Sequence, residues 1–213
     1  MNKYFLFLTI LLLFNICNTT DIGKVIKLPD PKRQGGMPLF EALNIRQSSR
    51  GFNDSIRVTP EIISQALWSC YGIREGKFRT TPSAKAWYPL LVYVFLEEGV
   101  FIYNPGSHQL IQLFNGDHRA LTGTQTSVVT NARVNFVFIA DFKKKSAMDG
   151  DDAHKLRSIY LDSGHVTMAL SLFASANNMK GVVRAMVDTD ALLDFLRLNK
   201  KDYIFTIAYS LGY

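Results

Sequence analysis

The sequence predicts a single α+β domain built from antiparallel strands and packed helices. Residues 89–114 contain β-branched and aromatic runs broken at residues 98–99 and 104–106, as in two or three short antiparallel strands. Residues 60–72 and 151–178 carry apolar residues at helical spacing instead. These segments do not alternate regularly, no repeat or interdomain linker separates them, and 213 residues suit one domain with a sizeable core.

Two helices are expected in the first third of the chain. Residues 38–45 form a short one, with Leu39, Leu43 and Phe40 as candidates for burial. The stretch RVTPEIISQALWSCYGI carries stronger signals, because Thr59 can cap a helix that begins at Pro60. The apolar residues that follow helical spacing are Ile62, Ile63, Ala66, Leu67 and either Cys70 or Tyr71. Gly72 ends the helix.

The remaining elements follow from the same patterns. ARVNFVFIADF is apolar almost throughout and predicts a central strand, and DYIFTIAYSLGY predicts a strand that closes the chain. Between them a long helix spans roughly residues 151–178, and Asp188 caps a short helix. The inward candidates of the long helix are Leu156, Ile159, Tyr160, Met168, Leu172 and Phe173, and Gly164 indicates close packing against it.

The first 20 residues are expected to be an export signal rather than part of the fold. An early lysine precedes an apolar run from Tyr4 to Phe14, too short for a comfortable membrane span, and small polar residues follow. The predicted location is therefore periplasmic or extracellular, with cleavage near residue 20 or lipid attachment at Cys17. Residues 21–37 read as an extended lead-in to a domain that covers residues 38–213. Cys70 would then be the one remaining cysteine, a small core residue.

Composition and motifs exclude several functions. The net charge of +6 suits an anionic ligand, but no dense basic run interleaved with aromatics indicates nucleic acid. The four histidines lack metal-ligand spacing, so no metal site is expected. The sequence also contains no serine-hydrolase elbow, no P-loop and no dinucleotide-binding glycine motif.

One polar stretch, NIRQSSRGF, places Arg46 and Arg50 four residues apart with serines between them. On a helical turn the two guanidiniums would share one face, and arginine is well suited to gripping phosphate. The alternative is a solvated helix end with two ordinary surface arginines.

Four stretches in order resemble the nitroreductase family of FMN-dependent oxidoreductases, and its peptide-modifying, azoline-oxidising dehydrogenase branch in particular. They are IRQSSRGF, TTPSAKAWYPLLVYV, EEGVFIYNPGSHQL and LDSGHVTMALSLFASANNMKGVVRAMVD. Together they span about residues 38–213. The resemblance implies a nitroreductase-like fold, with a central, mostly antiparallel sheet flanked by helices, in an intertwined homodimer that binds FMN.

The resemblance also assigns site residues. Arg46, Ser48 and Arg50 would contact the phosphate and ribityl end of FMN. A segment from the other subunit would line the flavin with Pro82, Ser83, Ala84 and Ala86. Gln125, in the loop before the central strand, would face the ring, and a later loop would pass its pyrimidine or N5 edge with Val183, Arg184 and Ala185.

The implied activity is hydride or electron transfer through flavin N5 to a small-molecule acceptor, with NAD(P)H or another donor and with no catalytic side chain identified. Three features depart from the family pattern. Lys85 stands where the branch has glycine, HVTMAL lacks the Gln-Asn pair, and the Lys/Arg pair that some members carry near the C-terminus is missing. The oxidoreductase is the leading interpretation. Lys85 and the missing C-terminal pair motivate an alternative, a non-catalytic exported binding protein that keeps the fold and holds an anionic ligand or none.

Overall fold

The computed structural model describes residues 23–143 and 150–213. The expected export signal, with Cys17, lies outside these residues. A seven-stranded sheet in the order β1-β6-β5-β4-β7-β9-β8 organises the fold, and all its neighbouring strands are antiparallel. The strands are β1 (Val25–Lys27), β4 (Leu90–Leu96), β5 (Gly99–Asn104), β6 (Gln109–Asn115), β7 (Val134–Asp141), β8 (Lys180–Arg184) and β9 (Tyr203–Gly212). The predicted α+β class with an antiparallel sheet is confirmed.

The central position of β7 explains its continuous apolar sequence. Its side chains alternate between two hydrophobic cores, with Phe136 and Phe138 on one face of the sheet and Val137 and Ile139 on the other. All four are fully buried. The strand is therefore covered on both faces, as its sequence predicts.

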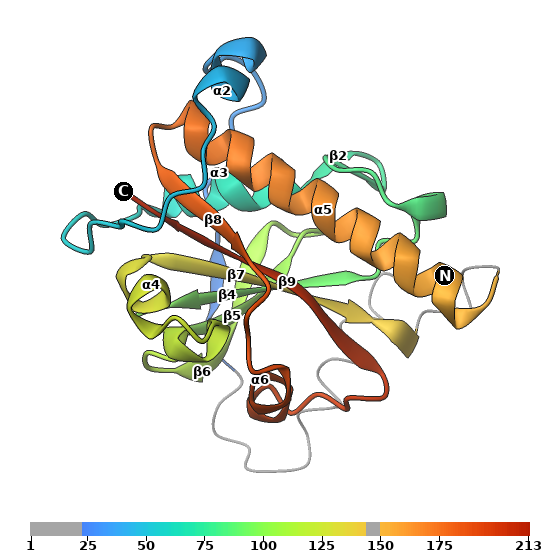
Figure 1. Ribbon diagram of the computed structural model, residues 1–213. Helices are drawn as coiled ribbons and strands as arrows, with labels where there is room; N and C mark the ends of the chain where they lie inside the picture. Colours follow the sequence, from blue (N-terminus) through green and yellow to red (C-terminus); the bar gives the residue numbers. More distant parts are fainter. Residues whose placement is uncertain (1–22, 144–149) are drawn as a thin grey trace.

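Two helices cover one face of the sheet (Figure 1). They are α3 (Pro60–Tyr71) and α5 (Asp152–Ala176). Thr59 and Asp151 accept hydrogen bonds from backbone amides of their first turns, which confirms the predicted N-cap of α3 and the predicted start of α5. Leu67 and Leu170 pack with Phe136 in the larger core, which also holds Cys70 as predicted.

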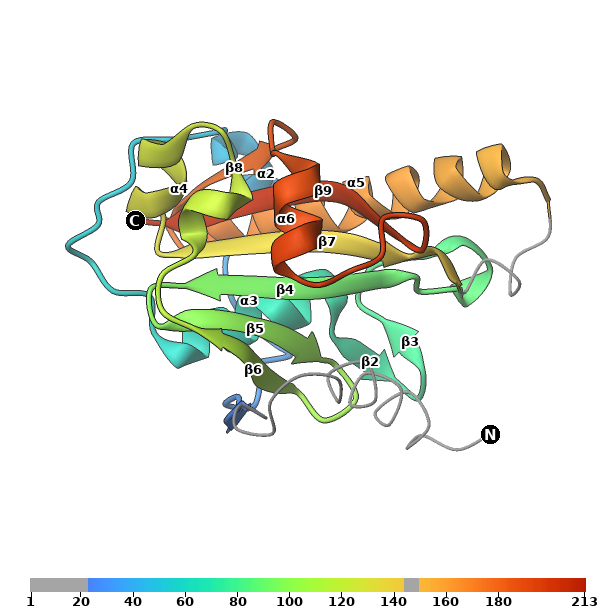
Figure 2. The ribbon, with the colours of Figure 1, turned by 90° about the horizontal axis from the view of Figure 1, so that it is seen from below.

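The opposite face carries a smaller cover (Figure 2). The short helix α6 (Thr189–Phe195), capped by Asp188, packs Leu192 and Leu193 against Phe95 and Val137. A 3-10 turn, η2 (Arg119–Thr122), lies beside it. The sheet is therefore enclosed between unequal helical layers.

Several elements form in segments whose sequence carries no specific signal for them. The lead-in contributes β1, which pairs with β6 at the edge of the sheet. A small hairpin precedes residues 82–86, which are called the Pro-Ser segment below. A helical turn precedes β7, and β8 lies at the other edge of the sheet. These additions are β2 (Ile73–Glu75), β3 (Phe78–Arg79), η1 (Ala84–Ala86), α4 (Thr126–Asn131) and β8.

Helix α2 (Leu39–Ile45) and the outer face of α5 contradict the predicted burial. Of the α2 residues only Ala42 is buried, and Phe40 is 83% exposed. On α5, Tyr160 and Met168 are also exposed, and a Cβ added to Gly164 would meet nothing within 4 Å. The apolar periodicity correctly predicts two helices, but one apolar side of each has no cover among the described residues. No helix among residues 23–143 and 150–213 is long and apolar enough to cross a membrane.

Candidate functional site

The segment that follows α2 holds Arg50 against the sheet edge. Helix α2 ends at Ile45, and residues 46–52 are irregular, so the predicted sharing of one helical face by Arg46 and Arg50 is wrong. The amide of Ser49 donates to the carbonyl of Gly181 in β8 (3.0 Å), and Phe52 packs on Val182. The chain is thereby fixed along β8, with Arg50 exposed above it.

The predicted loop at residues 183–185 is instead the end of β8. Val183 and Arg184 are its last two residues and pair with Tyr209 and Ala208 of β9, and only Ala185 lies beyond the strand. Side chains alternate along the strand, so Val183 is exposed while Arg184 is buried. Strand geometry therefore sends these neighbouring residues to different sides of the sheet.

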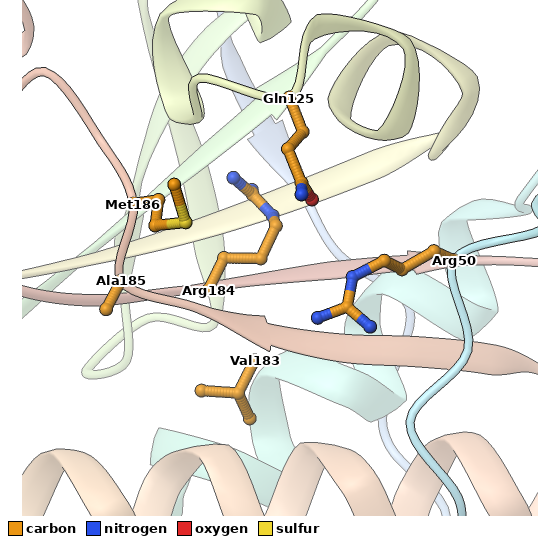
Figure 3. A pocket seen from close by; sticks show the side chains of 6 residues that line it. All are labelled: Arg50, Gln125, Val183, Arg184, Ala185 and Met186. Carbon is orange, nitrogen blue, oxygen red and sulfur yellow. The ribbon is translucent and has the colours of Figure 1, made fainter.

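A pocket forms where β8 ends. Thr124 donates its amide to the carbonyl of Met186 (3.0 Å), which holds the start of α4 beside this strand end. The side chains of Gln125 and Arg50 approach from two sides (Figure 3). The pocket has a volume of about 100 Å³ and is lined by Arg50, Gln125, Val183, Arg184, Ala185 and Met186. Five of these six residues are among those that the sequence assigned to the cofactor.

Arg184 is the most constrained residue of the pocket. It is only 7% exposed, and its guanidinium donates to four oxygens. These belong to Ser210 Oγ (2.8 Å), Asn135 Oδ1 (3.0 Å), Thr122 Oγ1 (3.2 Å) and the Thr122 carbonyl. Burial lowers the pKa of Arg184 to about 10, which leaves the side chain protonated at neutral pH.

Three of these partners were missed by the sequence reading. Asn135 in β7 and Ser210 in β9 are polar and fully buried, as is Thr122. The available signal was a polar residue inside an otherwise apolar strand, because such a residue needs a buried hydrogen-bond partner. Met186 was also missed, and its sequence neighbourhood carries no comparable signal.

The remaining predicted residues do not line this pocket. Arg46 is half-buried and Ser48 is exposed in the segment before Arg50. The segment with Pro82, Ser83, Ala84 and Ala86 lies against α5 instead, where Asp162 binds it. Within one chain the Pro-Ser segment therefore lies apart from the pocket, beside α5.

Asp162 holds the Pro-Ser segment through two hydrogen bonds. Its carboxylate accepts from Ser83 Oγ (2.5 Å) and from the Ala84 amide (3.2 Å), and Ser83 Oγ accepts from the Tyr88 amide (2.9 Å). Burial raises the pKa of Asp162 against the opposing effect of those bonds. Lys85 lies in this segment at φ 49°, so the backbone keeps a left-handed conformation although lysine stands where the family branch has glycine.

The pocket chemistry suits an anion rather than acid–base catalysis. Its lining supplies two guanidiniums and one amide but no carboxylate or imidazole. Arginine provides rigid, multiple donors for phosphate or for an electron-rich ring edge. Cys70 is no substitute nucleophile, because it is buried in the core and burial raises the pKa of its thiol.

The residues present fit FMN in kind but not in volume. Arg50 offers a cation for a phosphate, and Gln125 and Arg184 offer polar groups for a ring edge. A site for a ligand of this size usually encloses about 300–1,000 Å³, well above the pocket of a single chain. One chain therefore provides only part of a cofactor-sized site.

Comparison with known proteins gives a consistent family assignment. A model described as "Nitroreductase family" matches residues 43–213. A Methanocaldococcus jannaschii protein named as a nitroreductase is 29% identical over 161 residues, which cover 71% of this chain and 78% of that protein.

Solved structures share the fold. A protein from Ralstonia eutropha JMP134 described as a nitroreductase has a TM-score of 0.81 and 26% identity, over 90% of both chains. A chain of the Escherichia coli microcin synthetase McbBCD complex, with truncated pro-MccB17 bound, has a TM-score of 0.70 and 18% identity, over 87% of this chain and 77% of that one. A Desulfovibrio desulfuricans protein in complex with FMN has a TM-score of 0.61 and 18% identity, over 84% and 87%. The resemblance drawn from the four sequence stretches is confirmed.

Proposed function

This chain belongs to the nitroreductase family, and from that premise we propose that it is an FMN-dependent oxidoreductase. It passes a hydride or electrons from NAD(P)H or another donor, through flavin N5, to a small-molecule acceptor. The observation that carries the proposal is the pocket at the end of β8. It brings together Arg50, Gln125 and residues 183–185, which come from three distant parts of the sequence.

The chain's own residues bind and orient the cofactor. In this proposal Arg50 contacts the phosphate, while Gln125 and the end of β8 face the ring; the support is that all of them line the same pocket. FMN, when bound, supplies the redox chemistry, so the protein needs no paired acid and base. This agrees with a pocket lined by cations and neutral groups.

We propose that the working form is a homodimer. Two observations support it: the single-chain pocket is too small for FMN, and the Pro-Ser segment, which the family resemblance assigns to the flavin of the other subunit, lies outside it. The uncovered apolar sides of α2 and α5 supply a surface that a second copy would bury: Leu39, Phe40, Leu43, Ile45, Leu161 and Met168. Gly164 on α5 leaves room for close approach.

We also propose that the protein is exported by its first 20 residues. The support is the charge and hydropathy layout of that segment. Expression of the full-length chain, followed by fractionation and mass spectrometry, tests this: a periplasmic or secreted product that begins near residue 20, or one lipidated at Cys17, is expected. A full-length product that stays in the cytoplasm refutes export.

The central test is the visible spectrum of the purified protein, followed by titration of the flavin-stripped protein with FMN. We expect a yellow protein whose flavin is reduced by dithionite and reoxidised by a quinone or nitro compound. A colourless protein that cannot be reconstituted with FMN would refute the enzyme and favour the alternative, a non-catalytic binding protein. Riboflavin serves as the matched ligand without a phosphate.

A further inference from the structure

Arg79 and Tyr71 carry most of the buried polar atoms that have no hydrogen-bond partner. Within residues 23–143 and 150–213 there are four such side-chain atoms: Tyr71 Oη, Arg79 Nε, Arg79 Nη1 and Arg133 Nε. Three of the four belong to one pair of residues. Buried polar groups are nearly always paired, because an unpaired one opposes folding. Their concentration at one place indicates a role beyond packing.

Two tyrosine rings hold the Arg79 guanidinium in place. Arg79 ends β3, Tyr71 ends α3, and Tyr88 follows η1. Arg79 Cζ lies 4.9 Å from the centre of the Tyr71 ring and 5.4 Å from that of Tyr88, as in cation–π contacts. The Arg79 amide also donates to Tyr88 Oη (3.4 Å). These contacts fix the guanidinium and leave its Nε and Nη1 hydrogens unpaired.

The positive charge of Arg79 has no counter-ion in the described part of the chain. No carboxylate there forms an ion pair with it. Asp162 is close enough to act on the Tyr71 hydroxyl, but its two oxygens already accept from Ser83 Oγ and the Ala84 amide. The structure therefore presents a fixed cation whose neutralising anion must come from elsewhere.

The donors are partly accessible to solvent. Arg79 and Tyr88 are half-buried, whereas Tyr71 is only 4% exposed. The Tyr71 hydroxyl lies near the Leu90 amide without completing a hydrogen bond to it, so its own hydrogen remains available. Burial raises the pKa of Tyr71, which keeps this hydroxyl a donor at neutral pH.

We propose that Arg79, Tyr71 and Tyr88 form a binding site for the carboxylate of a small organic acid. The guanidinium supplies a charge and buried N–H donors, and Tyr71 supplies an O–H donor. A carboxylate accepts several such bonds and pairs strongly with arginine. None of the three residues lines the pocket at the end of β8, so this site does not depend on the proposed function.

The charge balance favours a carboxylate over a phosphate dianion. Arg79 is the one cation, among the residues that the structure describes, that acts on the Tyr71 hydroxyl, and the negative charge of Asp162 acts on it in the opposite sense. A singly charged ligand neutralises Arg79, whereas a second negative charge would face Asp162 without a partner.

Calorimetric titration of the purified protein with sodium benzoate tests the site. We expect saturable binding that Arg79→Gln weakens about tenfold or more, because the charge-assisted hydrogen bonds are lost. Arg79→Lys should recover only part of the affinity, because lysine lacks the planar set of donors. Arg74→Gln is the matched control, an exposed arginine of the same hairpin, and should leave the affinity within about twofold of wild type. Any binding of inorganic phosphate should be the same in Arg79→Gln and wild type.

Tyr71→Phe separates ligand binding from a structural role. It removes only a hydroxyl that has no partner, so the free energy of unfolding should stay constant or rise. Benzoate affinity should nevertheless fall about threefold or more, because one donor to the carboxylate is lost. Should Arg79→Gln fail to fold, this variant carries the test. Wild-type protein that binds no benzoate, variants that bind it as tightly as wild type, or phosphate binding that Arg79→Gln abolishes would each overturn the inference.

Discussion

Replacing Asp162 by alanine tests whether the Pro-Ser segment depends on the long helix α5. Asp162 is only 4% exposed, and its carboxylate accepts hydrogen bonds from Ser83 Oγ and the Ala84 amide. Three residues in or just after this segment lie in the left-handed region, which disfavours side chains with a Cβ: Lys85 at φ 49°, Ala86 at φ 53° and Tyr88 at φ 50°. The conformation therefore needs an external anchor.

The loss of stability expected for Asp162→Ala follows from the contacts that it removes. Hydrogen bonds to a charged group contribute about 1.5–3 kcal/mol each, and each left-handed residue costs roughly 1–2 kcal/mol. Losing both bonds to Asp162 should lower the free energy of unfolding by about 3 kcal/mol once the segment relaxes. For a domain of this size that corresponds to a Tm lower by about 6–12 °C.

Thermal unfolding followed by circular dichroism measures the effect. Asp162→Asn should lower the Tm less than Asp162→Ala does, because its amide oxygen can still accept a hydrogen bond from the Ala84 amide. Ala86→Gly should raise the Tm of the wild type slightly, because glycine adopts the left-handed conformation without penalty. Asp54→Ala is the control, an exposed aspartate in an irregular segment. A Tm for Asp162→Ala within about 2 °C of wild type would show that the segment is held by other contacts.

Three further outcomes follow from the described contacts. Arg50→Ala should weaken FMN binding about ten- to a hundredfold and riboflavin binding little, whereas Arg46→Ala, outside the pocket lining, should weaken FMN less; equal effects in a calorimetric titration would contradict this. Met168→Lys on the exposed side of α5 should convert a dimer into monomers in light scattering, and an unchanged mass would contradict the proposed interface. Hydrogen bonds from Arg119 hold the pKa of Asp117 below its ordinary value of 3.8. The ion pair therefore stabilises the fold above that pH, and its contribution is lost on acidification. In urea unfolding, the free energy of unfolding of Asp117→Asn should fall less steeply below about pH 4 than that of wild type.

The sequence was most informative where a pattern depends on neighbouring residues. The caps Thr59 and Asp188 and the apolar run of β7 predicted real elements, because hydrogen bonds at a helix start and burial of a central strand involve local residue types. The four ordered stretches also indicated the family. Short elements such as β8 were missed, because edge pairing with a distant strand leaves little local signal.

Tertiary structure decided how the candidate residues are used. The sequence marked Arg46 and Arg50 as equivalent, but the end of α2 and the contact of Ser49 with β8 bring only Arg50 into the pocket. The sequence assigned Arg184 to the flavin by family resemblance alone and did not predict the neutral hydrogen-bond acceptors that surround its guanidinium. The charge balance of a buried group depends on what folding brings to it from β7, β9 and η2, and sequence spacing does not encode that.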